Sequence, residues 1–171
     1  MEHLKDLIRA VPDFPQPGIL FRDLTPLMGR PDAMRAVTDA LVARHGGLGV
    51  DAVAGVESRG FIFGAPLAMA LGVGFVPIRK AGKLPAATVR EAYALEYGTA
   101  TLEMHADAVP PGARVLLVDD VLATGGTARA AARLIEAVGA SVAAAAFVVE
   151  LEFLAGRAAL EGYAVDALLR Y

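Results

Sequence analysis

The chain has no cysteine and only three histidines among its 171 residues. Without cysteine there is no disulfide framework, no thiol nucleophile and no cysteine-ligated metal, and nothing indicates an oxidising compartment. The histidines, His3, His45 and His105, lie far apart and do not show metal-ligand spacing. Thiol catalysis is therefore excluded, and a histidine metal centre is not expected.

The chain also lacks an excess of basic residues, since its formal net charge is −3 and 20% of its residues are charged. This balance gives no basic face for duplex nucleic acid. The first residues, MEHLKDLIRAV, place charges among apolar side chains and so lack the uninterrupted apolar core of a secretory signal. We therefore expect a cytoplasmic protein that does not bind nucleic acid.

One stretch without charge, residues 60–78, approaches the length of a membrane-spanning helix. Its second half is broken by Gly72, Gly74 and Pro77. The pattern favours a buried helix that ends near Leu71, followed by a short strand from Phe75 to Ile78. We expect no membrane span.

The remaining pattern alternates helices with strands in a single domain of α/β class. Such alternation predicts a mostly parallel central sheet flanked by helices, with ligands at the carboxyl ends of the strands. The expected elements are an N-terminal helix from Leu4 to Val11, an irregular proline-rich segment 12–28, a helix 32–45, a strand 51–57, the buried helix and strand just described, a basic loop that becomes strand-like near Tyr93, a strand 114–118, a helix from Thr127, a strand 141–150, a short helix 155–162 and a final strand 163–171.

The junction at residues 119–127 combines two acids with two glycines. A helix that begins at Thr127 presents unpaired backbone N–H groups to an anion. Gly125 and Gly126 let the backbone approach a phosphate, and Thr124 and Thr127 add hydroxyl donors. Asp119 and Asp120 would repel a phosphate but suit the hydroxyls of an attached sugar. The alternative is a plain glycine turn with Asp120 capping the helix.

The string VLLVDDVLATGGT, residues 115–127, resembles the phosphoribosyl pyrophosphate (PRPP) motif of type I phosphoribosyltransferases. DFPQPGILFRDLTPL, ESRGFIFGAPLA, VPIRKAGKLP and YALEYGTATLEMH occur with it in the order typical of the adenine phosphoribosyltransferase family. The resemblance covers nearly the whole chain. It implies a type I phosphoribosyltransferase fold, with a small N-terminal hood over about residues 1–30 and a flexible loop and strand over about residues 79–105.

The resemblance implies that adenine and PRPP give AMP and pyrophosphate, with magnesium, in purine salvage by a homodimer. Catalytic roles fall to Glu96 and Arg59. Magnesium is expected to bind through PRPP near Asp119 and Asp120, and no direct protein ligand is assigned to it. The implied substrate-binding residues are Phe21 and Arg22 for adenine; Arg59, Arg79, Lys80 and Lys83 for pyrophosphate; Asp119 and Asp120 for the ribose hydroxyls; Ala123, Thr124, Gly125, Gly126 and Thr127 for the 5′-phosphate; and Tyr97.

The residues leave simpler interpretations open. Glu96 and Glu103 could be charges that discourage edge pairing of a strand. Arg59 could form a surface ion pair with Glu57, and Arg22 could be solvated. Other members of the superfamily act on xanthine, hypoxanthine or guanine, or sense PRPP as regulatory domains. The regulatory alternative needs a DNA-binding module, for which the segment before Pro12 leaves no room.

The basic loop carries the last hypothesis, that residues 81–91 form a lid over PRPP. Gly82 supplies backbone freedom, and Lys83 and Arg90 supply charge that a pyrophosphate would attract. A closed lid would protect the reactive sugar from water. The alternative is a surface loop that is indifferent to ligand.

Overall fold

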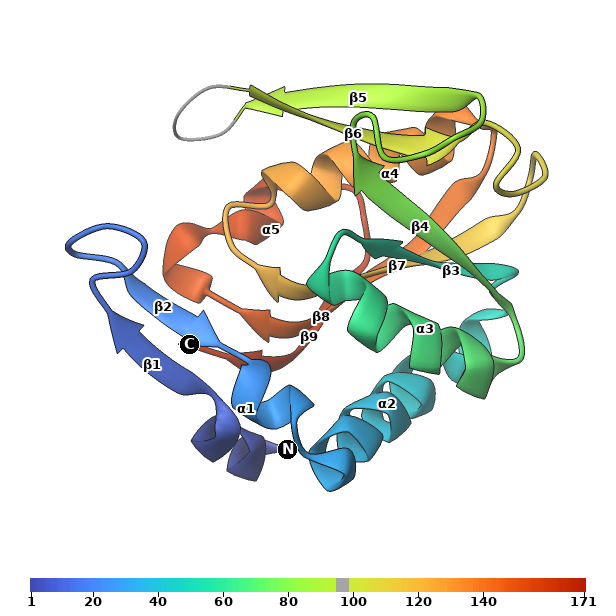
Figure 1. The fold of residues 1–171 in the computed structure, drawn as a ribbon. Helices are drawn as coiled ribbons and strands as arrows, with labels where there is room; N and C mark the ends of the chain where they lie inside the picture. Colours follow the sequence, from blue (N-terminus) through green and yellow to red (C-terminus); the bar gives the residue numbers. More distant parts are fainter. Residues whose placement is uncertain (95–98) are drawn as a thin grey trace.

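A seven-stranded sheet forms the centre of the protein, whose computed structural model describes residues 1–94 and 99–171 (Figure 1). The strand order is β5-β6-β4-β3-β7-β8-β9. Strands β4, β3, β7, β8 and β9 are parallel to one another, whereas β6 pairs antiparallel with both β4 and β5. The mostly parallel sheet is as predicted. The strands are β3 (Ala52–Val56), β4 (Gly74–Lys80), β5 (Thr88–Ala94), β6 (Thr99–His105), β7 (Arg114–Leu122), β8 (Ser141–Glu150) and β9 (Val165–Arg170).

Helices cover both faces of this sheet, which explains why its central strands are runs of Val, Leu and Ala. Successive side chains of β7 point to opposite faces: Leu117 packs in the cluster that contains Ile135 of α4 (Gly126–Ala137). Leu116 packs in the other cluster, with Phe63 of α3 (Arg59–Leu71) and Leu41 of α2 (Pro31–His45). The described residues contain no helix long and apolar enough to cross a membrane.

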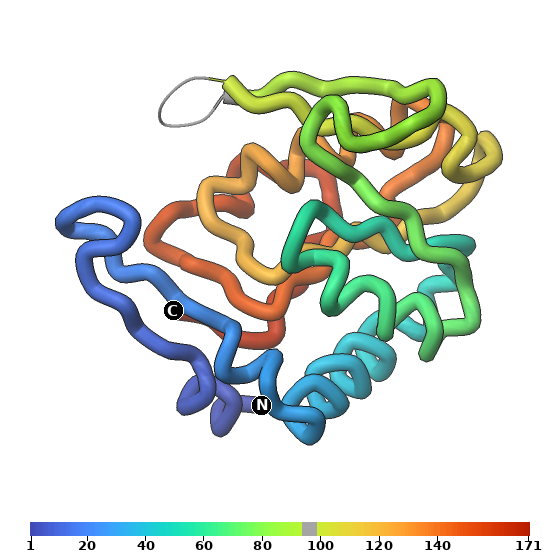
Figure 2. Tube along the Cα trace, viewed as in Figure 1, coloured from blue at the N-terminus to red at the C-terminus, as the bar shows by residue number. Residues whose placement is uncertain are grey.

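The prediction of an N-terminal helix from Leu4 to Val11 is wrong beyond Leu7. A 3-10 helix, η1 (Glu2–Leu7), is followed by β1 (Arg9–Pro12), which pairs antiparallel with β2 (Leu20–Asp23). Ile8 already has extended backbone angles, and Val11 lies opposite Phe21 in this ribbon. The apolar residues that suggested one helical face therefore serve two different elements. The hood is this ribbon, which lies beside the C-terminus in Figure 2.

Three other boundaries differ from the prediction. The region predicted as a loop that becomes one strand near Tyr93 contains two strands instead, because β5 pairs antiparallel with β6 from Thr88↔His105 to Ala94↔Thr99. Strand β7 continues through both acids to Leu122, where it is still paired with β8. Strand β4 extends to Lys80 through pairing with β6. The long-range partners that set these limits are not visible in the local sequence pattern. The short elements are α1 (Thr25–Met28), η2 (Gly46–Leu48), η3 (Glu152–Leu154) and α5 (Gly156–Ala159).

Candidate active site

A cavity of about 630 Å³ lies between the hood and the carboxyl ends of the parallel strands. This is where an open α/β sheet usually binds its ligand. The cavity is lined by the hood, by the turns after β3 and β7, by the segment after β8, and by single residues of β4, β5 and β6. Segments distant in the sequence therefore contribute to one site.

The turn from β7 into α4 contributes backbone and hydroxyl groups. Gly125 has φ +84° and precedes the first residue of the helix, so a left-handed conformation is required there. Thr124 and Thr127 line the cavity with Ala123 and Gly125, whereas Gly126 does not. The unpaired N–H groups at the start of α4 make this turn suited to an anion.

Two carboxylates precede that turn, at the end of β7. Asp120 is 4% exposed, and its backbone N–H donates to Asp119 Oδ1 at 2.9 Å. Burial, and then the negative charge of Asp120, raise the pKa of Asp119 well above its usual range. A Cβ at Gly60 would lie 2.9 Å from Asp119 Oδ1, so only glycine lets α3 approach this carboxylate so closely. Hydrogen bonds donated to Asp119 would favour its charged form, so the site is suited to hydroxyl donors.

Arg59 pairs with Asp120, to which its Nε donates, and not with Glu57. The simple surface pair of Arg59 with Glu57 is therefore wrong. Glu57 instead accepts from Arg79 Nε and from the backbone N–H of Lys80, each at 3.1 Å. The Arg59 side chain remains 42% exposed at the cavity, so its guanidinium is accessible to an anion.

The basic residues after β4 are not equivalent. Lys80 lines the cavity, whereas Arg79 and Lys83 do not. The Arg79 guanidinium is held by Glu57 and also donates from Nη1 to the carbonyl oxygen of Lys83 at 3.3 Å. Of the three predicted pyrophosphate ligands in this segment, the structure brings Lys80 to the cavity.

Glu103 organises the loop that carries Lys83. Its side chain is fully buried, and Oε1 accepts from the backbone N–H groups of Lys83 at 2.9 Å and Leu84 at 3.0 Å. The Arg90 Nε lies 3.4 Å from Oε2. The N–H of Leu84 lowers the pKa of Glu103, with burial acting in the opposite direction. The edge-protection interpretation of Glu103 is wrong, because β6 lies between β5 and β4.

The hood places one aromatic and one basic residue at the cavity. Phe21 packs edge-on against Phe14, with centroids 5.2 Å apart, and the Arg59 guanidinium lies 5.7 Å from its ring centroid. Arg22 also lines the cavity, but its guanidinium stacks 3.9 Å from the ring centroid of Tyr171. Arg22 is therefore engaged with the C-terminal residue rather than solvated.

Sequence reasoning missed the segment after β8. Leu151, Phe153 and Leu154 line the cavity, and Phe153 is 72% exposed. These apolar residues follow a buried strand directly, and the rule that ligands bind at the carboxyl ends of parallel strands was the signal that could have identified them. They give the cavity an apolar wall in addition to Phe21.

Two of the predicted residues, Glu96 and Tyr97, lie outside the described residues. Across residues 1–94 and 99–171, no three His, Asp or Glu side chains form a group that could hold a metal ion. A magnesium ion that is held mainly by substrate oxygens, with at most one or two carboxylates, is compatible with this arrangement.

The comparisons with known proteins agree with this geometry. Residues 30–166 match the family model described as phosphoribosyl transferase domain. The chain is 63% identical over 167 residues to the adenine phosphoribosyltransferase of Nocardioides sp. (strain ATCC BAA-499 / JS614), covering 95% of this chain and 90% of that relative.

Two crystal structures of adenine phosphoribosyltransferases superpose closely on this chain. The structure from Thermoanaerobacter pseudethanolicus has a TM-score of 0.97 and 50% identity, covering 99% of both chains. The structure from Saccharomyces cerevisiae, in complex with an imino-altritol bisphosphate and adenine, has a TM-score of 0.93 and 44% identity, covering 98% of this chain and 97% of that one. The chain belongs to the phosphoribosyltransferase family and, within it, to the adenine phosphoribosyltransferases.

Proposed function

We propose that the chain transfers the 5-phosphoribosyl group of PRPP to adenine, giving AMP and pyrophosphate in purine salvage. The observation that carries this proposal is the anion-binding turn 123–127, which lies in one cavity with Asp119, Asp120 and the apolar wall around Phe21. A phosphate, a sugar with free hydroxyls and a flat apolar base match these three parts in that order. The names of the close relatives support the same assignment.

The 5′-phosphate binds at residues 123–127, and the ribose hydroxyls donate to Asp119 and Asp120. Asp120 is already paired with Arg59, which balances its charge in a buried position. Arg59 also faces the pyrophosphate, whose other basic partner at the cavity is Lys80. Arg79 and Lys83 act as more distant positive charges beside the same loop. These groups orient PRPP and stabilise the charge that develops on the leaving group.

Magnesium bound together with PRPP would neutralise pyrophosphate charge and so stabilise the leaving group. Asp119 and Asp120, which line the cavity together with Glu57, would be available to a metal held mainly by substrate oxygens.

Adenine binds against Phe21 and the apolar residues of the segment 151–154. Arg22 supports this wall through its stacking on Tyr171. Tyr97 contributes from the LEYG segment. A base held between apolar side chains keeps its nitrogen close to the sugar carbon and excludes water from the reaction centre.

Glu96 is the acid-base candidate, acting on a proton of adenine or stabilising the cationic sugar. The change Glu96→Gln should lower kcat by about 10²–10⁴-fold, because general acid-base catalysis contributes that range. Steady-state kinetics with both substrates measures this effect. Turnover within a few-fold of the wild type would return Glu96 to an edge-protecting role.

The assembly is a homodimer in the cytoplasm, and residues 81–91 act as the lid. The outer face of α3 supports self-association, because Ile62 is 43% and Met69 83% exposed there. Gly82, with φ +81° and nothing within 4 Å of a Cβ, gives the loop before β5 a position with conformational freedom and open space.

The test is initial-rate measurement with adenine, hypoxanthine, guanine and xanthine at fixed PRPP and magnesium. Adenine should be the best substrate, and AMP formation should require magnesium. Faster transfer to a 6-oxopurine would assign the chain to the alternative base specificity. An Asp120→Asn variant is the matched control, because loss of a ribose contact should weaken PRPP binding by about 1.5–3 kcal/mol without changing the order of bases.

A further inference from the structure

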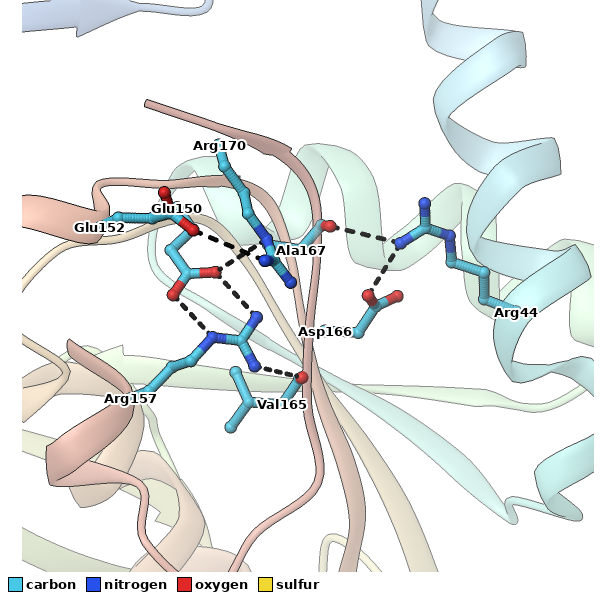
Figure 3. Close-up of polar contacts among 8 residues, drawn as sticks. All are labelled: Arg44, Glu150, Glu152, Arg157, Val165, Asp166, Ala167 and Arg170. Atoms are coloured by element: carbon cyan, nitrogen blue, oxygen red, sulfur yellow. Dashed lines mark hydrogen bonds and ion pairs between the residues drawn. The ribbon is translucent and has the colours of Figure 1, made fainter. Parts of the chain in front are cut away.

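An ion pair between a buried carboxylate and a partly exposed arginine lies outside the cavity lining, next to the phosphate-binding turn. Glu150 ends β8 and is 3% exposed. Arg157 of α5 donates to both of its carboxylate oxygens, from Nε at 2.7 Å and from Nη2 at 2.8 Å (Figure 3). The Arg157 Nη1 donates to the carbonyl oxygen of Val165 at 2.8 Å. This one side chain therefore connects α5 to the last residue of β8 and to the first residue of β9.

The residue before Arg157 contacts the phosphate-binding turn through backbone atoms alone. A Cβ on Gly156 would lie 2.2 Å from the carbonyl oxygen of Ala123. A Cβ on Gly125 would lie 2.3 Å from the carbonyl oxygen of Gly156. No side chain fits between the two segments, so a displacement of Gly156 must displace Ala123 and Gly125 as well.

Helix α5 needs an external support to keep this position. It is four residues long, too short to be stable by its own hydrogen bonds. Leu160, which is 1% exposed, anchors the end of α5 in the core. Arg157 supplies the anchor at the beginning of α5, next to the contact with the phosphate-binding turn.

The apolar wall for the base is held by other bonds. The N–H of Leu151 donates to the carbonyl oxygen of Leu122, and the N–H of Glu152 donates to that of Tyr171, both at 2.9 Å. Loss of the Arg157 side chain leaves these two bonds in place. A disturbance at Arg157 should therefore reach the phosphate-binding turn more than the base-binding wall.

We infer that Arg157, paired with Glu150, is a positioning residue for the 5′-phosphate: it fixes Gly156, and through Gly156 the backbone of Ala123 and Gly125. The inference rests on the proposed role of residues 123–127 as the phosphate site. Arg157 acts through the backbone of the turn and does not line the cavity itself.

The test compares Arg157→Gln and Arg157→Lys with Arg170→Gln. Arg170 is a matched control, because its Nε lies 3.6 Å from the same Glu150 carboxylate but its Nη1 pairs with Glu152 on the far side (Figure 3). Calorimetric titration with ribose 5-phosphate measures the phosphate site directly. Steady-state kinetics gives KM for PRPP and for adenine separately.

Arg157→Gln should weaken ribose 5-phosphate binding and raise KM for PRPP, each by about tenfold, because small displacements of binding groups have large effects. The KM for adenine should stay within about twofold of the wild-type value, because the bonds that hold the base-binding wall do not involve Arg157. Arg157→Lys keeps the charge but not the two-pronged geometry, so its effect should be intermediate. Arg170→Gln should keep the wild-type affinity for ribose 5-phosphate and the wild-type KM for PRPP.

Equal losses for adenine and PRPP, or a lowered melting temperature with unchanged ribose 5-phosphate affinity, would overturn the inference. Should Arg157→Gln fail to fold, Arg157→Lys alone decides between these results. A wild-type protein that does not bind ribose 5-phosphate would remove the phosphate assignment and the inference together. Normal wild-type binding with no difference between Arg157→Gln and Arg170→Gln would remove the inference alone.

Discussion

Two buried glutamates support the active site from opposite sides, and they do so in different ways. Glu103 on β6 accepts hydrogen bonds mainly from backbone N–H groups of the loop 83–84, whereas Glu150 on β8 accepts from the side chain of Arg157. The loop beside Glu103 has room, since a Cβ on Gly82 would have nothing within 4 Å. The turn beside Arg157 has none, since Gly156 and Gly125 meet backbone atoms directly.

The two supports therefore hold different surroundings: a loop with open space at Gly82, and a turn that is in close contact with Gly156. A carboxylate that accepts backbone N–H groups can hold a loop with open space around it, and the lid proposed for residues 81–91 requires such space. Phosphate binding instead requires fixed N–H groups, because their alignment must exist before the ligand arrives. The two sides of the cavity therefore match the two halves of PRPP, a fixed 5′-phosphate and a departing pyrophosphate.

The largest effect should follow from adding a single methyl group at Gly156, where α5 is in close contact with the phosphate-binding turn. Gly156 does not have a positive φ, so alanine is conformationally acceptable there and the change adds only volume. Gly156→Ala should lower kcat/KM for PRPP by about 10²-fold, because the turn must shift to admit the methyl group. Steady-state kinetics and ribose 5-phosphate titration measure the loss.

Gly162→Ala is the control for that change. Gly162 follows the same short helix, and a Cβ there would have nothing within 4 Å, although its φ of +93° strains any L residue. This variant should lose some stability and keep its affinity for ribose 5-phosphate. If Gly156→Ala also kept its affinity for ribose 5-phosphate, the claim that Gly156 fixes the phosphate-binding turn would be disproved.

A smaller effect should follow from removing the Glu103 carboxylate, which supports the loop that contains Lys83 and Leu84. Glu103→Ala leaves the N–H groups of Lys83 and Leu84 without their buried acceptor, so the loop should open more often. Trypsin cleavage after Lys83 should accelerate by about tenfold relative to the wild type, because proteolysis follows the population of the open form. PRPP with magnesium should slow this cleavage in the wild type.

Glu103→Gln is the matched control, because it retains one oxygen acceptor for the two N–H groups. It should fall between the wild type and Glu103→Ala. Cleavage that is equally fast in all three proteins would show that Glu103 does not hold the loop, and an unchanged rate with saturating ligand would remove the lid.

The sequence was sufficient for the parts of the site that are contiguous in the chain. Asp119, Asp120 and the turn 123–127 form one uninterrupted string, and the structure places them at the carboxyl end of β7 as expected. The order of helices and strands was also predictable, because buried strands and amphipathic helices have distinct periods. The N-terminal ribbon was not, since the apolar residues before Pro12 fit a helix locally and only the pairing with β2 selects a strand.

The residues that support the site could not be predicted from the sequence, for a different reason. Glu103 was interpreted as a charge at a strand edge because the neighbours of β6 are set by pairing at long range. Gly156 lies 29 residues beyond the end of the turn that it contacts, and Arg157 follows it, within a string that predicts only a short helix. Contacts between backbone atoms leave no pattern of residue types except the glycine itself. Residues that position a site are therefore harder to predict than residues that bind the ligand.

The smallest expected effect concerns acid stability and distinguishes Glu103 from its uncharged analogue. The pKa of Glu103 is lowered from the ordinary value of 4.5, chiefly by the hydrogen bond from the N–H of Leu84. The N–H groups of the neighbouring residues act in the same direction, and burial acts in the opposite direction. A carboxyl with a lowered pKa stabilises the folded state above its unfolded pKa, and this contribution is lost as the pH falls through the folded pKa. The wild type should therefore be more stable than Glu103→Gln at pH 7, and the difference between them should shrink below about pH 4.5. Urea unfolding midpoints of both proteins from pH 7 to pH 3 measure this convergence. A difference that stayed constant over the whole range would mean that the charge of Glu103 contributes nothing, and that its hydrogen bonds to the loop act equally well from a neutral side chain.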